Sequence, residues 1–139
     1  IWKAGAASVI VSCHVASGVE CQDSSALAFC DQQGWLAACV SDGAGTARLA
    51  KQGSQIASSM FVREMSSVAT KVDGKGVGEW LIDEIVQVVL RIRDTLRQRQ
   101  DSTLSDYNCT LVGCLVGPSG GVLVHLGDGL AIGGVFALR

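Results

Sequence analysis

The sequence predicts one α+β domain, and two observations carry that prediction. Short apolar runs gather near both ends of the chain, while the middle carries two segments with helical spacing. Strands that are grouped in this way, instead of alternating with helices, favour an α+β fold over βαβ units. A length of 139 residues suits one domain with a sizeable core.

The first part of the chain predicts three strands. Residues Ala6–Val15 are small and β-branched, and Ser25–Cys30 and Gly34–Val40 are apolar runs. The polar stretch Asp31–Gly34 lies between the last two runs and is typical of a turn.

The middle of the chain predicts two helices joined by a glycine-bearing loop at Lys71–Gly78. The first helix covers Ala47–Val68, and its expected core face holds Leu49, Gly53, Ile56, Ala57 and Met60. The second has apolar residues at three- and four-residue steps, with another set predicted to face away. The apolar set is Leu81, Ile85, Val88, Ile92 and Leu96, and the outward set is Glu84, Gln87, Arg91 and Asp94.

The last part returns to apolar runs. Residues Cys109–Gly117 and Val122–Leu126 predict a hairpin closed by the turn Pro118–Gly121. A further run, Leu130–Leu138, follows the Gly127-Asp128-Gly129 corner. Because the chain starts at Ile1 and stops within this run, we expect a fragment of a longer domain.

Composition excludes several classes of partner. The net charge is −2 and the pI is about 5.6, so neither nucleic acid nor an anionic membrane is an expected partner. No apolar run reaches the roughly 18 residues that span a bilayer. The six cysteines lack Cys-x-x-Cys spacing, and a zinc site at Cys13, His14 and Cys21 has no evident fourth ligand. A cytoplasmic protein with free, buried thiols is predicted.

Three aspartates stand where apolar runs begin or end beside small residues. They are Asp23, Asp42 and Asp128. Carboxylates together with backbone carbonyls are the ligands that Mg²⁺ and Mn²⁺ prefer, and glycine lets a carbonyl approach an ion closely. Each of these aspartates, taken alone, is more typical of a turn than of a metal site.

Four segments of the chain, which include these aspartates, resemble motifs of one protein family and occur in the same order as in that family. The run Val40-Ser41-Asp42-Gly43-Ala44-Gly45 resembles the Asp-Gly-x-Gly signature of metal-dependent Ser/Thr protein phosphatases of the 2C type. Cys21-Gln22-Asp23-Ser24 is similar to the upstream acidic segment of the bacterial members. Cys109–Gly113 and Leu126–Gly129 are similar to the central Gly-Thr-Thr strand and the Gly-Asp-Ser/Gly motif.

The resemblance implies a four-layer α-β-β-α sandwich, of which residues 1–139 are the N-terminal part. It implies that Asp42 bridges two Mn²⁺ or Mg²⁺ ions, that the Gly43 carbonyl binds one of them, and that Asp23 ligates a metal directly or through water. Asp128 would help to hold a third, weaker ion. The implied reaction is hydrolysis of a phosphorylated protein by a metal-activated water that attacks phosphorus in line, with no protein nucleophile.

Two departures from the family pattern leave alternatives open. Ala44 replaces the histidine that many members have, and Gly18 stands where an arginine commonly grips phosphate, so the phosphate-binding residues are unknown. The family's further Asp ligands lie beyond this chain. A catalytically impaired 2C-like binding or regulatory module, or an inactive fragment of a phosphatase, is therefore the alternative to an active enzyme. Incomplete sheets also predict self-association through an exposed sheet surface.

Overall fold

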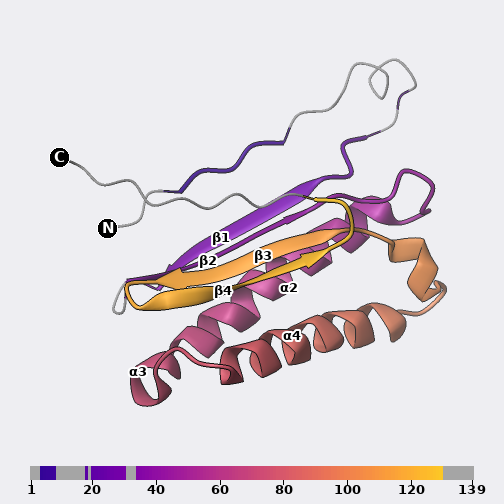
Figure 1. Ribbon diagram of the computed structural model, residues 1–139. Coiled ribbons are helices and arrows are strands. Elements are labelled where there is room, and N and C mark those ends of the chain that lie inside the picture. Colours follow the sequence, from indigo (N-terminus) through magenta and orange to yellow (C-terminus); the bar gives the residue numbers. More distant parts are fainter. Residues whose placement is uncertain (1–3, 9–17, 19, 31–33, 130–139) are drawn as a thin grey trace.

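The computed structural model describes residues 4–8, 18, 20–30 and 34–129, and has one antiparallel sheet with helices on one of its faces (Figure 1). The predicted α+β class is confirmed. In chain order the elements are β1 (Ser24–Cys30), β2 (Trp35–Ser41), α2 (Ala50–Ala69), α3 (Val72–Lys75), α4 (Trp80–Arg97), the 3₁₀ turn η1 (Leu104–Tyr107), β3 (Leu111–Gly117) and β4 (Gly120–Leu126).

The four strands lie in the order β1-β2-β3-β4, and every neighbouring pair is antiparallel. The β3–β4 hairpin turns at Pro118 and Ser119, as the sequence predicts, with Gly117 paired to Gly120. Gly120 has a φ of 130°, a conformation that glycine adopts without strain. Helices α2, α3 and α4 and the turn η1 are inserted between β2 and β3, yet these two strands are neighbours in the sheet.

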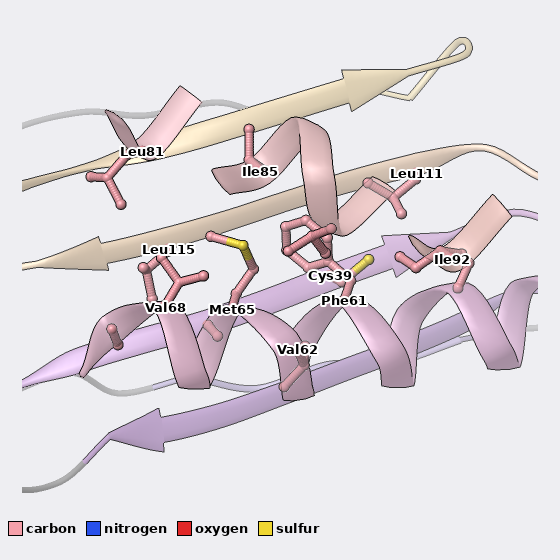
Figure 2. Close-up of a cluster of buried hydrophobic side chains, with 14 of the residues drawn as sticks. Cys39, Phe61, Val62, Met65, Val68, Leu81, Ile85, Ile92, Leu111 and Leu115 are labelled. Atoms are coloured by element: carbon pink, nitrogen blue, oxygen red, sulfur yellow. The ribbon is translucent and has the colours of Figure 1, made fainter. Parts of the chain in front are cut away.

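One face of the sheet, called the inner face below, packs on the helices. Its alternate residues include Trp35, Ala37 and Cys39 of β2 and Leu115 of β3, all of them buried. Glycines make room for aromatic rings on this face. A Cβ on Gly113 would lie 2.4 Å from the Phe61 ring. Figure 2 shows Phe61, Cys39 and Leu115 within the same buried cluster, so a small β3 residue and a large α2 residue fit together.

Helix α2 turns a somewhat different face to the sheet than the sequence predicts. Gly53 and Ala57 are buried as expected, but Leu49, Ile56 and Met60 lie only partly buried at the margin of the core. The deeply buried positions continue instead through Phe61, Met65 and Val68. Close backbone contact decides this orientation, because a Cβ on Gly53 would lie 2.3 Å from the Tyr107 carbonyl oxygen.

Helix α4 buries all five apolar residues that its spacing predicts (Leu81, Ile85, Val88, Ile92 and Leu96). Of the residues predicted to lie away from this core face, Arg91 is exposed and Glu84 is partly buried, and both form ion pairs at the surface. Lys71 Nζ lies 3.2 Å from Glu84 Oε1, and Arg91 Nη2 lies 3.1 Å from Glu64 Oε2. These ion pairs join one flank of α4 to α2 and to Lys71, the residue directly before α3.

The segment between these helices is also more ordered than a loop. Residues 72–75 form the short helix α3, and Val72 is buried against the core. The prediction of a loop from Lys71 to Gly78 is therefore wrong for this turn. Gly76, with a φ of 69°, ends it in a conformation that suits glycine.

The opposite face of the sheet, called the outer face, has no helix on it in the described part of the chain (Figure 1). Phe29, Val40 and Leu123 are exposed there, and residues 4–6 border a hollow of about 210 Å³ against it. The described residues thus contribute one sheet and one helix layer of the four layers expected. None of their helices is long and apolar enough to cross a membrane.

Two predicted strands lie wholly or largely outside the described residues. Residues 4–8, which include the start of the strand predicted at Ala6–Val15, are not in a strand. The remainder of that prediction, the run Leu130–Leu138 and the pair Cys13 and His14 lie outside the described residues.

Candidate functional site

The antiparallel strand order gathers the predicted site residues at one end of the sheet. β1 and β3 begin at the end where β2 and β4 finish. Asp23 precedes β1, Asp42 follows β2, Thr110 precedes β3 and Asp128 follows β4. Residues that are far apart in the sequence therefore share one edge because of topology alone.

Three hydrogen bonds hold Asp42 against the start of β3. The Thr110 backbone N–H donates to the Asp42 carbonyl oxygen at 2.8 Å, and the Asp42 N–H donates to Thr110 Oγ1 at 3.0 Å. The Ser41 hydroxyl donates to the Thr110 carbonyl oxygen at 2.5 Å. Thr110 thus positions the Asp42 backbone through both its main chain and its side chain. The apolar strand pattern of the sequence around Thr110 gives no sign of this positioning role.

Asp23 and Asp42 lie opposite each other across β1 and β2. Ser24 pairs with Ser41, and the Gly43 N–H donates to the Gln22 carbonyl oxygen at 3.2 Å, so the register continues past the ends of the strands. Residues directly opposite in an antiparallel pair have Cβ atoms about 4.5–5.5 Å apart. Both carboxylates are exposed. Like charges at this spacing repel, and a bound cation would remove that repulsion.

Gly43 occupies a position with no room for a side chain. A Cβ there would lie 2.8 Å from the Ala50 carbonyl oxygen and 2.9 Å from the Gln22 carbonyl oxygen. The same Gln22 oxygen accepts a hydrogen bond of 2.5 Å from the buried Ser54 hydroxyl of α2. Helix α2 therefore fixes the chain on both sides of the acidic pair, at Gln22 and at Gly43.

Ala44 continues the same anchoring. Its N–H donates to the Asn108 carbonyl oxygen at 2.8 Å, and Gly43 forms an isolated bridge with Cys109. The Asp-Gly-Ala segment is consequently tied to β1, α2 and the residues before β3. A free turn, which was the simpler interpretation of Asp42-Gly43, would not need these contacts.

Asp128 lies at the same end but apart from the acidic pair. β3 separates β4 from β2, and two strand spacings amount to roughly 10 Å. The preceding Gly127 has a φ of 99° and packs on Thr110, because a Cβ there would lie 2.7 Å from Thr110 Cγ2. Across residues 4–8, 18, 20–30 and 34–129, no group of three or more His, Cys, Asp or Glu side chains is placed to hold a metal ion.

The negative charge of Asp42 affects the pKa of the neighbouring Cys109 thiol. Burial raises the pKa of the Cys109 thiol, the Ser41 hydroxyl opposes that shift, and the negative charge of Asp42 adds to it. The thiol therefore stays protonated and is not a nucleophile at neutral pH. Cys109 acts here as a small core residue, as the sequence predicts.

The position that the resemblance assigns to phosphate binding is Gly18, which lies in an exposed turn with a φ of 72°. The nearest described basic residue in the chain after Asp42 is Arg48, and it pairs with Asp106 at 3.3 Å. Lys51, in the first turn of α2, pairs with Glu20 at 2.8 Å. The Lys51 pair joins α2 to the segment before Asp23, and the Arg48 pair joins the residues before α2 to η1.

One antiparallel sheet with helices on one face, and aspartates at one end of that sheet, define an α+β protein with an acidic candidate site, and the comparison with known families gives its family. Residues 12–135 match the protein phosphatase 2C family. The chain belongs to this family. It is 29% identical over 136 residues to "Serine/threonine-protein phosphatase 3" of Escherichia coli (strain K12), in an alignment that covers 92% of this chain. The chain spans 51% of that relative's length. No solved structure gives a significant match to the chain.

Proposed function

We propose that residues 1–139 form the N-terminal part of a 2C-type domain that hydrolyses phosphoserine or phosphothreonine in proteins. The observation that carries this proposal is the juxtaposition of Asp23 and Asp42 at the sheet end, in a chain that belongs to the protein phosphatase 2C family. The similar bacterial protein bears the name of a Ser/Thr phosphatase.

The residues present fit a divalent cation of the Mg²⁺ or Mn²⁺ kind. Two exposed carboxylates face each other, and the adjoining Gly43 occupies a position that admits no side chain. Hard oxygen ligands of this type suit these ions. Asp42 would bridge two ions, Gly43 would contribute its carbonyl to one, and Asp23 would ligate directly or through water. Asp128 would hold a third, weaker ion.

Bound metal would lower the pKa of a water for in-line attack on phosphorus and would stabilise the phosphate oxygens. The chain's own part is to hold the two carboxylates in register. Thr110 and Ser54 do this through the backbone of Asp42 and the carbonyl oxygen of Gln22. The phosphate ligand is unassigned, because Gly18 cannot take the role of an arginine.

The second candidate is a 2C-like regulatory or binding module without turnover. It is favoured by Gly18 and Ala44, which stand where family members commonly have an arginine that grips phosphate and a histidine. Such a module would bind Mn²⁺ weakly and leave phosphate esters intact. Self-association through the outer face, where Val40 and Leu123 are exposed, would suit either candidate.

Manganese-dependent hydrolysis of an aryl phosphate and of a phosphopeptide tests the proposal in the complete protein. Asp42→Asn should lower turnover by at least about 100-fold, since it removes a bridging ligand. Calorimetry should show weaker Mn²⁺ binding in the same variant. Asp73→Asn, an exposed aspartate in α3, is the matched control and should leave both quantities unchanged.

Equal hydrolysis by wild type and Asp42→Asn would contradict the metal assignment. Manganese binding without hydrolysis in the wild type would instead favour the binding module. Asp128→Asn should have a smaller effect than Asp42→Asn, because its carboxylate lies apart from the acidic pair.

A further inference from the structure

Helix α4 carries an aliphatic stripe that nothing covers in the described part of the chain. Ile82, Val86 and Leu90 recur at four-residue steps and are 56%, 48% and 43% exposed. Single exposed aliphatic residues are ordinary, but three in a row on one helix flank form a contiguous patch. The buried residues of α4 lie on a separate sector that faces α2 and the sheet.

The two flanks of α4 differ in whether their charged residues form ion pairs with residues outside the helix. On the flank toward α2, Glu84 and Arg91 each form an ion pair with a residue outside α4. On the flank of the aliphatic stripe, Arg93 and Glu79, the residue directly before α4, are exposed and form no ion pair with any described residue. Arg97, one turn beyond Arg93 on this flank, pairs within the helix with Asp94.

Helix geometry places these two charges on the stripe itself. At 100° per residue, Glu79, Arg93 and the three aliphatic residues fall within a sector of about 80°. Glu79 precedes Val86 by seven positions, and Arg93 follows it by seven. Each charge is therefore about 10 Å from Val86 along the axis, in opposite directions.

Opposite charges at equal distances on either side of Val86 match those of a second copy of the same helix in antiparallel orientation. We propose that α4 is a self-association surface, on which the stripe of one copy packs antiparallel to the stripe of a second copy about a two-fold axis at Val86. In this arrangement Ile82 meets Leu90 of the other copy, and Glu79 meets Arg93 twice. A parallel pair would place Glu79 on Glu79 and Arg93 on Arg93, which is repulsive. The interface is isologous and closes at two copies.

The dimer forms on a different surface from the outer face of the sheet. It leaves the sheet end that carries Asp23 and Asp42 uncovered, so it does not depend on the proposed catalysis. One helix flank is smaller than the roughly 1,200 Å² of a standard stable interface. The association is therefore weak and concentration-dependent.

Sedimentation velocity of the full chain across a range of concentrations tests the proposal. The wild type should dimerise, and Val86→Glu should weaken association at least tenfold, because it places two carboxylates on the two-fold axis. Gln87→Glu adds the same charge one position along, outside the stripe, and should leave the dimer unchanged. Circular dichroism should show all variants folded, because each substituted side chain is exposed.

A charge exchange tests the antiparallel register. Glu79→Arg and Arg93→Glu should each weaken the dimer about three- to tenfold, because each replaces two attractions with two repulsions. The double variant Glu79→Arg/Arg93→Glu should restore wild-type association to within about twofold. High salt should reduce the differences among these variants.

Three results would overturn the proposal. The first is a wild type that remains monomeric at all concentrations. The second is an association that Leu123→Glu abolishes and Val86→Glu does not, which would assign it to the outer face of the sheet. The third is a double charge variant that stays as weak as the single ones, which would exclude the antiparallel register.

Discussion

The two faces of the sheet both carry aliphatic side chains, yet only one of them is sealed. On the inner face, Trp35 is 2% exposed and Leu115 is fully buried under α2 and α4. On the outer face, Val40 is 51% exposed and Leu123 is 56% exposed. The inner face therefore supplies the stability of the described fold. The outer face is covered only in part, at Leu36 and Val112, and its other aliphatic residues remain available for further contacts.

The largest expected difference between the faces comes from removing a phenyl ring. Phe61→Ala should lower the free energy of unfolding by about 3–5 kcal/mol, because it leaves a cavity in the inner core. Phe29→Ala, on the outer face, should cost less than about 1 kcal/mol, since that ring is already 42% exposed. Urea unfolding measures both changes. Equal losses would show that the outer face is as well packed as the inner one.

A smaller effect is expected from adding a methyl group to the inner face. Gly113→Ala should cost about 1–3 kcal/mol, because its Cβ would lie 2.4 Å from the buried Phe61 ring. Gly74→Ala, where nothing lies within 4 Å, is the control and should be neutral or slightly stabilising.

The same clash predicts coupling between the two residues. In the background of Phe61→Leu, the added methyl group of Gly113→Ala should cost less than it does in the wild type. Strict additivity of the two changes in unfolding free energy would show that the ring and the glycine do not share one space.

The smallest expected difference between the faces is in how their thiols make the free energy of unfolding depend on pH. Burial, with smaller contributions from Cys109 and Cys114, raises the pKa of Cys39 from 9.0 to about 12. Below pH 9 the thiol is protonated in both states. As pH rises from 9 toward 12 the unfolded chain loses this proton first, so stability falls by up to about 1.4 kcal/mol per pH unit.

Urea unfolding at about pH 8 and about pH 10 tests this dependence. Cys39→Ala should flatten the loss of stability more than Cys114→Ala does. Burial also raises the pKa of Cys114 on the outer face, but the Ala38 N–H opposes that shift. Identical pH dependence in the two variants would contradict the difference between the faces.

Much of the secondary structure follows from periodicity in the sequence. The spacing of Leu81, Ile85, Val88, Ile92 and Leu96 predicts the buried face of α4 correctly, because one amphipathic helix needs only local information. The same reasoning misplaces the centre of the α2 face. Small residues such as Gly53 and Ser54 show no hydropathy signal, and their burial is decided by contacts with Tyr107 and Gln22.

The candidate site also has some features that the sequence reveals and others that only the structure reveals. The chemistry of Asp23, Asp42 and Asp128 beside small residues is visible in the sequence, and so is the order of the motifs. The roles of Thr110 and Ser54 are not visible, because their hydrogen bonds join residues that are 68 and 32 positions apart. The sequence also predicts that Glu84 and Arg91 lie outside the core, but only the packed structure shows that each of them meets an opposite charge there.

The sequence by itself therefore determined the α+β class, the family motifs and the residue types suited to a hard metal ion. Tertiary structure decided that Asp23 and Asp42 face each other while β3 keeps Asp128 apart. It also decided which flank of α4 is sealed and which carries the exposed stripe. The physical reason is that periodicity and composition act along the chain, whereas register, strand order and close packing depend on residues that meet only after folding.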